Sequence, residues 1–439
     1  MNEKYTVAVE IGSSKIIAAI GKSRGDGMLQ VVAVEQETDV DAIRYGIIQN
    51  LEDTYSCLSR LFGRLEQRSG IAPRKIKGVV VGLAGRSLRN IPTEVNLNLP
   101  EDTEITDDML ARLQDQALHV SVDSSLEVID AVPRKYKVGN IETESPKGMV
   151  GNRIDAVFDL IVCRPELKRN IKRVIADKMN LNVEGFVVTA MATGHLILTP
   201  DEKRLGCMLV DMGAQTTTVS IYKDGGLRYF ATLPMGGRNI THDLTSLGVI
   251  EARAEEIKKT SGDAMAAENA GNLIVGGLKF SDISNLIVAR SEEIVANIVE
   301  QISYAGLKES DLNGGIICIG GASRLKGIME LLGHECHLPV RSGKLPDYVR
   351  LEAAKGFHGE LIEVVSVLYA GATLSDHECL VLPELKEGPT GVLPLYSDEQ
   401  EEPKEKEQPR SGARKKFMET LGRKISNIFG NPDDDSELI

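Results

Sequence analysis

The apolar positions of the chain follow strand and helix periods in two separate blocks. In the first block, the pattern predicts strands over 6–11, 16–20 and 29–34, a helix over 51–69 and a strand over 77–83. In the second block, it predicts strands over 207–211, 217–222 and 227–233, mostly helical segments over 239–262 and 282–305, a strand over 314–319 and a helix over 325–332. The alternation of strands and helices predicts an α/β protein.

Both blocks open on the same turn between two strands. The segment Glu10-Ile11-Gly12-Ser13-Ser14-Lys15 matches Asp211-Met212-Gly213-Ala214-Gln215-Thr216 position for position, 201 residues downstream. In each copy an acid ends the first strand, a glycine stands two residues later, and a polar turn leads into an apolar strand. A repeat at this distance indicates two similar domains, because solenoid repeats have periods of about 20 to 50 residues.

A segment with a different order of predicted strands and helices lies between the two blocks. Residues 92–162 contain predicted strands over 94–99, 127–131 and 154–162 and a predicted helix over 107–119, which indicates a small α+β insertion. A basic helix is predicted over 168–179.

Composition and charge narrow the class of protein. The chain has 439 residues, of which 42% are hydrophobic and 26% charged, which predicts several globular domains. The net charge of −13 disfavours a broad nucleic-acid surface. Six scattered cysteines without a CxxC pair are typical of a reducing cytoplasm, and His334-Glu335-Cys336-His337 has no distant Cys or His pair to complete a zinc site. We expect no signal peptide and no transmembrane span, because the first residues lead into a strand pattern and no apolar run reaches about 18 residues.

The C-terminal residues change character after Tyr396. Residues 397–413 contain no large apolar side chain and predict a disordered linker. On a helical wheel, the next segment combines one apolar stripe with flanking cations, formed by Lys415, Lys416, Phe417, Met418, Leu421, Arg423, Lys424, Ile425, Ile428 and Phe429. This pattern is typical of a helix in an anionic membrane interface. Packing of the same helix on the body or on a partner remains the alternative.

The paired turns suit the binding of a polyphosphate. Gly12 and Gly213 would let backbone N–H groups approach phosphate oxygens, and Glu10 and Asp211 could hold Mg²⁺ or orient an attacking water. Further donors stand in the same turns, namely Ser13, Ser14, Lys15, Gln215, Thr216 and Thr217. Two ordinary hairpins are the alternative.

A third element follows a buried strand. Gly320-Gly321-Ala322-Ser323 would let the backbone lie against a ribose or base, which suits an adenosine site, although a plain strand-to-helix turn is the alternative. No Walker A sequence is present, which disfavours a P-loop enzyme.

These three elements, in this order, resemble the nucleotide-binding signature of the actin, Hsp70 and sugar-kinase superfamily. The chain is further similar to the FtsA family of bacterial cell-division proteins. Pro234-Met235-Gly236-Gly237 with Ile240, Thr241 and Asp243 resembles one of its segments, and Ala254-Glu255-Glu256-Ile257-Lys258 resembles its helix that contacts the nucleoside. Its insertion is matched by Pro133, Tyr136, Pro146, Gly148, Met149 and Gly151. The chain departs from the pattern at Glu10, where the superfamily usually has Asp, at Gly139, and before Leu368, where a Pro is expected.

The resemblance implies an actin-like fold of duplicated ribonuclease-H-like domains, with ATP and Mg²⁺ as cofactors. Glu10 and Asp211 would be the metal and catalytic positions. The ATP-binding residues would be Gly12, Ser13, Ser14, Lys15, Gly213, Gln215, Thr216, Thr217, Gly236, Gly237, Glu255, Lys258, Gly320, Gly321, Ala322 and Ser323. The implied subdomains are IA (1–83, 165–203 and a closing segment 359–396), the insertion IC (84–164), IIA (204–240 and 313–358) and IIB (241–312), followed by the linker (397–413), the amphipathic helix (414–430) and an acidic tail (431–439).

The resemblance also implies a function. The protein would polymerise at the cytoplasmic face of the membrane at the division site and anchor FtsZ filaments there, with the FtsZ C-terminal tail docked on IIB and other division proteins reached through IC. It would be primarily a scaffold and at most a weak ATPase. The alternatives are a sugar or polyol kinase, for which no general base can be located, an Hsp70-like chaperone, for which no substrate domain follows, and a pilus-assembly relative, against which the terminal helix argues.

Overall fold

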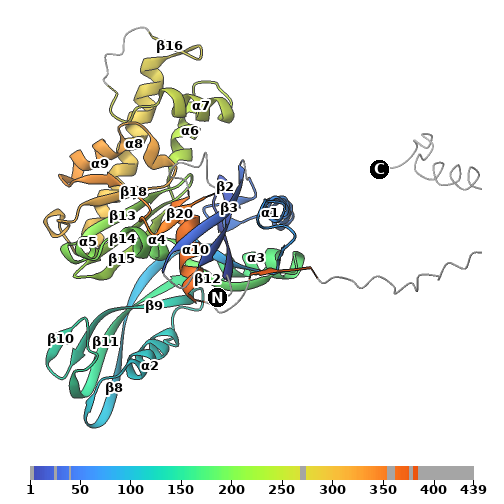
Figure 1. The fold of residues 1–439 in the computed structure, drawn as a ribbon. Helices are drawn as coiled ribbons and strands as arrows, with labels where there is room; N and C mark the ends of the chain where they lie inside the picture. Colours follow the sequence, from blue (N-terminus) through green and yellow to red (C-terminus); the bar gives the residue numbers. More distant parts are fainter. Residues whose placement is uncertain are drawn as a thin grey trace, which may run out of the picture. The chain divides into compact units, whose positions relative to one another are not determined.

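The computed structural model describes residues 4–23, 27–38, 41–266, 273–352, 361–374 and 379–383 (Figure 1). All of them belong to one compact unit, Met1–Glu384. The predicted linker, amphipathic helix and acidic tail over 397–439 lie outside the described residues. Within the described part of the chain, no helix is both long and apolar enough to cross a lipid bilayer.

The first half of the fold is built on a six-stranded sheet of order β12-β7-β1-β2-β3-β20. The antiparallel strands are β1 (Lys4–Ile11), β2 (Lys15–Ser23) and β3 (Leu29–Thr38). On one side β7 (Gly78–Leu83) pairs in parallel with β1, and β12 (Asn182–Val188) pairs in parallel with β7. On the other side β20 (Val349–Leu351) pairs in parallel with β3. Most of β1 and β2 is buried, because α1 (Leu51–Glu66) contacts β2 and β3 and α10 (Ile362–Leu374) contacts β1, β2 and β7. Asn50 caps the start of helix α1, because its side chain accepts hydrogen bonds from two backbone N–H groups of the first turn.

The second half repeats this connectivity. Strands β13 (Cys207–Met212), β14 (Thr217–Lys223) and β15 (Gly226–Leu233) are antiparallel, and β18 (Ile316–Ile319) and β19 (Val340–Ser342) continue in parallel from β13. Asp224 and Gly225 connect β14 to β15 with φ of 54° and 85°, the left-handed pair of a type I′ hairpin turn. The predicted duplication is therefore confirmed at the level of strand order.

The segment predicted to be mostly helical over 239–262 is mostly helical in the structure. It forms two helices, α6 (Gly237–Thr245) and α7 (Glu251–Ser261), and Gly248 adopts a left-handed φ of 83° between them. Helix α8 (Phe280–Tyr304) buries isoleucines at helical spacing, and α9 (Ile328–Cys336) begins three residues later than predicted.

The remaining elements are short or lie in connections. They are β4 (Ile43–Arg44), β5 (Ile47–Ile48), β6 (Lys75–Ile76), α3 (Glu166–Lys172) with the π-helical turn Arg173–Lys178, α4 (Thr189–Ile197), α5 (Pro200–Leu205), β16 (Ile274–Val275), β17 (Leu278–Lys279), the 3-10 turns Glu309–Asp311 and Ala322–Arg324, and β21 (Leu380–Val381).

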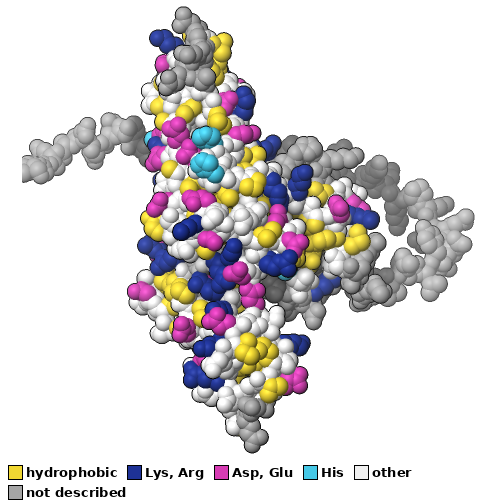
Figure 2. All heavy atoms as spheres, turned by 90° about the vertical axis from the view of Figure 1, so that its left-hand side faces the viewer, with side chains coloured by type: hydrophobic (Ala, Val, Ile, Leu, Met, Phe, Trp, Pro, Cys, Tyr) yellow, Lys and Arg dark blue, Asp and Glu magenta, His cyan; other side chains and the backbone are white. Residues whose placement is uncertain are grey.

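The insertion consists of β8 (Arg89–Glu104), α2 (Asp107–Leu118), β9 (Glu127–Val138), β10 (Ile141–Thr143) and β11 (Val150–Cys163). It is inserted between β7 and β12 of the first half, yet its strands extend the sheet of the second half, in the order β10-β9-β11-β8-β15-β14-β13-β18-β19. Figure 1 shows these cyan and green strands running on from β15. On the face of the molecule in Figure 2, acidic and basic side chains are interspersed.

A buried ion pair fastens the insertion to β15. Asp159 is fully buried and accepts hydrogen bonds from Arg134 Nε at 2.7 Å and Asn90 Nδ2 at 2.7 Å. The same Asn90 accepts from the backbone N–H of Phe230 at 2.9 Å, and Arg134 donates to the carbonyl of Arg228 at 3.0 Å. Both partners of the Asp159 carboxylate therefore also bind β15.

Replacing Asp159 by alanine should destabilise the fold, because Arg134 would keep a largely buried charge without its partner. We expect the free energy of unfolding to fall by about 3 kcal/mol, measured by urea denaturation. The matched control is Asp155→Ala, which removes an exposed ion pair with Arg153 and should cost less than about 1 kcal/mol. Equal losses in the two variants would contradict the structural role of Asp159.

Candidate nucleotide site

The two repeated turns have the same hydrogen bond and the same need for glycine. Gly12 N–H donates to the carbonyl of Lys15 at 3.0 Å, and Gly213 N–H donates to the carbonyl of Thr216 at 2.8 Å. A Cβ on either glycine would stand 2.9 Å from that carbonyl oxygen. The sequence repeat is therefore a repeat of one turn geometry, placed in both copies beyond the carboxyl end of a buried strand, where ligands of α/β sheets commonly bind.

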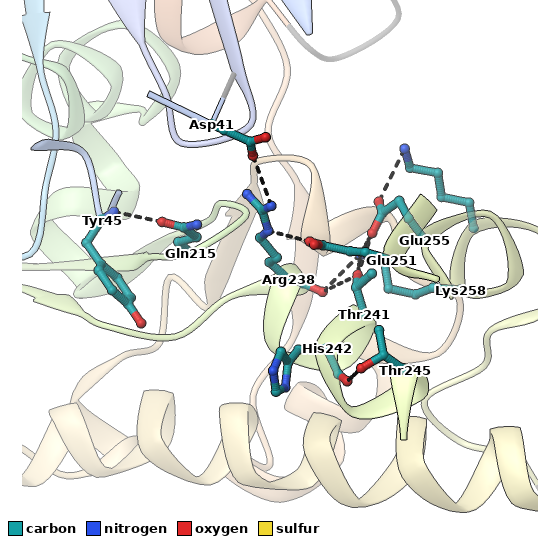
Figure 3. A network of polar contacts seen from close by, with 12 residues as sticks. Asp41, Tyr45, Gln215, Arg238, Thr241, His242, Thr245, Glu251, Glu255 and Lys258 are labelled. Carbon is teal, nitrogen blue, oxygen red and sulfur yellow. Dashed lines mark hydrogen bonds and ion pairs between the residues drawn. The ribbon is translucent and has the colours of Figure 1, made fainter. Parts of the chain in front are cut away.

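One short turn of the chain contacts both repeated loops. Tyr45 and Gly46, which connect β4 to β5, have left-handed φ of 50° and 78°. The backbone N–H of Gly46 donates to Ser13 Oγ at 3.0 Å, and that of Tyr45 donates to Gln215 Oε1 at 2.8 Å (Figure 3). Since Ser13 belongs to the first loop and Gln215 to the second, the two loops face a common junction. Ser14 is exposed beside them.

Three carboxylates and one ammonium group interact at this junction. Burial, and next the negative charge of Glu363 on α10, raise the pKa of Glu10 to about 7, against the opposing charge of Lys15. Burial, Glu363 and Glu10 likewise raise the pKa of Asp211 well above its ordinary value. The junction thus concentrates negative charge that a bound cation would neutralise.

This donor set fits Mg²⁺ shared with a phosphate. Within the described residues, no three Asp, Glu, His or Cys side chains lie close enough together to hold a metal ion by themselves. Mg²⁺ is usually bound through one or two carboxylates, several waters and substrate phosphates, which is compatible with Glu10 and Asp211 as its protein ligands.

The predicted Gly-Gly segment packs directly on the second loop. Gly237 N–H donates to the carbonyl of Gly213 at 3.0 Å, and a Cβ on Gly236 would come within 2.5 Å of the same oxygen. Thr217 is fully buried, and its hydroxyl donates to the carbonyl of Met235 at 2.9 Å, so it supports this contact. Thr216 is half-buried in the second loop.

Helix α7 brings Glu255 and Lys258 to the same place. Lys258 Nζ donates to the carbonyl of Gly237 at 2.9 Å, to Thr241 Oγ1 at 2.8 Å and to Glu255 at 2.6 Å (Figure 3). Burial lowers the pKa of Lys258, while hydrogen bonds from Lys258 and Thr241 overcome the effect of burial and lower the pKa of Glu255. These contacts of Lys258 fix the start of α6 against α7.

The predicted adenosine segment closes this group of residues. Gly320 has a left-handed φ of 86°, and a Cβ there would come within 2.5 Å of an Asp211 carboxylate oxygen. Ser323 Oγ donates back to the carbonyl of Gly320 at 2.8 Å, and Gly321 has open space where a Cβ would stand. The Ala322 methyl group would lie 3.0 Å from a Cβ on Gly237, so the adenosine segment borders the Gly-Gly segment.

An ion pair also joins the two halves near this site. Arg238 Nε donates to Glu251 at 2.6 Å, and Arg238 Nη2 lies 3.3 Å from Asp41, which belongs to the first half (Figure 3). Asp41 is 89% exposed, so this contact is a weak one.

The structure thus brings the predicted cofactor-binding residues of the two repeated turns, the Gly-Gly segment, α7 and the adenosine segment to one junction. The predicted membrane residues between Lys415 and Phe429 lie outside the described residues. Sequence reasoning missed Tyr45, Arg238 and Glu363. A signal existed for Glu363, because it is the single charged residue of the apolar stretch 361–374.

Comparisons with known proteins agree with this geometry. The sequence model of the family described as "Cell division protein FtsA" matches residues 208–355, and that of the "SHS2 domain inserted in FTSA" matches residues 85–162. The chain is 27% identical over 352 residues to the cell division protein FtsA of Pseudomonas aeruginosa, which covers 77% of this chain and 83% of the relative. It is 29% identical over 353 residues to FtsA of Neisseria meningitidis serogroup B, covering 78% and 84%.

A solved structure supports the fold. The PilM–PilN type IV pilus biogenesis complex aligns with a TM-score of 0.57 at 15% identity, covering 83% of this chain and 98% of that chain. The assignment to a family rests on two findings. The two family models match the second half and the insertion, and the curated relatives span most of the chain. The chain belongs to the FtsA family of cell-division proteins, with an actin-like fold that carries the SHS2 insertion.

Proposed function

We propose that this protein binds Mg-ATP between its two halves, polymerises at the cytoplasmic face of the membrane and anchors FtsZ filaments there during septum formation. The observation that carries the proposal is the convergence of the two repeated turns, with Glu10 and Asp211, on the junction that also receives the Gly-Gly and adenosine segments. A polyphosphate held there would contact both halves at once.

ATP would act as a conformational ligand. Among the described residues, the contacts near the site that join the halves include the Tyr45–Gln215 hydrogen bond and the exposed Arg238–Asp41 pair. Both contacts are polar, and a ligand with phosphates on both loops would favour one arrangement of the halves by its differential contacts. Mg²⁺ held by Glu10 and Asp211 would neutralise phosphate oxygens and relieve the repulsion between the carboxylates. Asp211 is also our candidate for orienting an attacking water if ATP is hydrolysed.

The partners follow from the family and from the sequence beyond the described residues. The basic and apolar residues between Lys415 and Phe429 would insert into an anionic leaflet. The FtsZ tail would dock on residues 241–312, where α6 and α8 border a hollow of about 460 Å³ whose lining includes His242, Leu286 and Arg290. Subunits would self-associate into filaments, and the insertion would reach other division proteins.

Replacing Asp211 by alanine should weaken Mg-ATP binding at least about tenfold, because a protein ligand of the cation is lost. Isothermal titration calorimetry with and without EDTA separates this effect from loss of the nucleotide contacts, since metal-free ATP, which the Asp211 carboxylate repels, should bind the variant at least as tightly as the wild type. Asp201→Ala, which removes an exposed carboxylate paired with Arg204, is the control. Equal Mg-ATP affinity of the Asp211 variant and the wild type would remove the assigned role.

Replacing Glu10 by glutamine should stabilise the metal-free protein while weakening Mg-ATP binding. The folded-state pKa of Glu10, about 7, lies above its ordinary value of 4.5, so this group costs the wild type stability as pH rises from 4.5 through 7. In EDTA, the thermal midpoint of the variant should exceed that of the wild type by an amount that grows from pH 5 to pH 8, corresponding to roughly 2–3 kcal/mol.

The matched control for that measurement is Glu37→Gln. Hydrogen bonds from Arg64 and Arg60 lower the pKa of Glu37 despite the effect of burial, so its replacement should destabilise the protein at pH 8. A Glu10 variant whose midpoint difference from the wild type is independent of pH would contradict the electrostatic account of the junction.

Deleting residues 414–439 should leave the body folded and abolish co-sedimentation with anionic vesicles. The full chain with ATP should recruit purified FtsZ filaments to those vesicles, and the truncated chain should bind FtsZ in solution without recruiting it. Unchanged vesicle binding by the truncated chain would refute the anchor. A full chain that binds vesicles but recruits no FtsZ would refute the tether.

A further inference from the structure

The turn between β4 and β5 is held firmly by the first half of the molecule. The strands on its two sides bury Ile43, Ile47 and Ile48 in the hydrophobic core around β1 and β2. The carbonyl of Tyr45 accepts the backbone N–H of Arg86 at 3.1 Å, and the Arg86 guanidinium lies over the Tyr45 ring, with Cζ 5.1 Å from the ring centroid. The turn therefore moves with the first half.

The backbone of this turn is unusual at two consecutive residues. The left-handed φ of 50° at Tyr45 is unfavourable for a residue that carries a side chain, and Gly46 follows with 78°. A Cβ on Gly46 would come within 2.5 Å of the carbonyl oxygen of Ala84. In this conformation the two successive N–H groups reach two different acceptors, Ser13 in the first repeated loop and Gln215 in the second.

Gln215 stands on a loop that the second half holds equally firmly. Besides the internal hydrogen bond of the loop, Arg238 N–H donates to the carbonyl of Ala214 at 2.7 Å. The half-buried side chain of Gln215 extends from this loop to Tyr45, where its Oε1 accepts the backbone N–H at 2.8 Å (Figure 3). Because a backbone N–H can only donate, the atom that faces it is the amide oxygen, and the amide NH2 group points away from it.

We propose that Gln215 is a positioning residue that latches the second phosphate loop to the first half of the molecule. The latch is the Tyr45–Gln215 hydrogen bond, and the inference rests on the proposed binding of Mg-ATP between the halves. The bond joins two rigid pieces of chain that are 170 residues apart in the sequence, so a relative movement of the halves at this point breaks it. By fixing the spacing of the two loops, the latch lowers the cost of bringing both of them to one ligand.

This role differs from the direct donation to a phosphate that the sequence predicts for Gln215. A phosphate donor acts through the amide nitrogen and only on bound nucleotide, whereas the latch acts through the amide oxygen and joins two protein groups. The Asp41–Arg238 contact nearby involves a carboxylate that is 89% exposed, so it adds little to the latch. A neutral, partly buried hydrogen bond shifts an equilibrium about two- to tenfold, which is measurable in the balance between arrangements of the halves.

The test measures the distance between the halves in the absence of nucleotide. Spin labels at two exposed positions, Gln67→Cys at the end of α1 and Ala252→Cys in α7, report this distance by double electron–electron resonance. A Cys57→Ser background leaves five cysteines, all of them buried. Gln215→Met removes the acceptor at nearly the same side-chain length, and it should raise the population of a second arrangement about two- to tenfold. The matched control, Ser14→Ala, removes an exposed hydroxyl that is predicted to bind phosphate but lies outside the latch, so it should leave the distances unchanged.

A second variant guards against a folding defect in the first. Gln215→Asn keeps an amide that is one methylene shorter, so its oxygen falls short of Tyr45, and it should shift the distances in the same direction as Gln215→Met. Thermal midpoints close to that of the wild type establish that a variant is folded.

Calorimetry with Mg-ATP on the same proteins separates this inference from the function on which it rests. If Gln215 only donates to a phosphate, its variants and Ser14→Ala weaken Mg-ATP binding while every distance distribution without nucleotide stays that of the wild type, and the latch is overturned. A shift of equal size in Ser14→Ala would also overturn it, because the effect would then not be specific to the Tyr45 contact. If the wild type binds no Mg-ATP while the Gln215 variants shift the distances, the proposed nucleotide binding fails and the latch stands.

Discussion

The burial of Glu10 and Asp211, to which repulsion among Glu10, Asp211 and Glu363 adds, is the constraint on which the junction depends. Two of these carboxylates occupy equivalent positions in the duplicated halves, so any arrangement that brings the repeated turns together also brings two negative charges together. The positive charge of Lys15 opposes this effect and lowers the pKa of both Glu10 and Asp211. Ionisation of these carboxylates is therefore unfavourable at the junction, and a divalent cation placed between them would offset that cost.

Two glycines show that separate backbone segments pack closely against the second turn at the same junction. At Gly236 and Gly320, an added Cβ would collide with backbone or carboxylate oxygens of the second turn. The segments that contain Gly236 and Gly320 thus lie against the second turn at distances that leave no room for a side chain. The site is consequently a property of backbone geometry, and side chains such as Lys258 and Thr217 serve to hold that geometry.

Much of this arrangement could be predicted from the sequence, because the signals were local. The matched turns at Glu10 and Asp211, and the hairpin signal at Asp224-Gly225, depend on a few adjacent residues. The missed features are long-range. Glu363 approaches Asp211 through the packing of α10, and Tyr45 reaches Gln215 across 170 residues, which no periodicity encodes. Apolar spacing likewise does not report the left-handed conformation of Gly248, which separates the two helices within 239–262.

The sheet shared by the insertion and β15 has a consequence for evolution and engineering. The insertion is encoded as one uninterrupted piece, which suggests that it could be exchanged between homologues as a cassette. However, Asn90 accepts a hydrogen bond from the backbone of Phe230, and Arg134 donates one to the carbonyl of Arg228, both in the other half. A chimaera that receives the insertion of a homologue alone would lose matched contacts between the insertion and β15. A compatible graft must therefore include the facing residues of β15 along with residues 84–164.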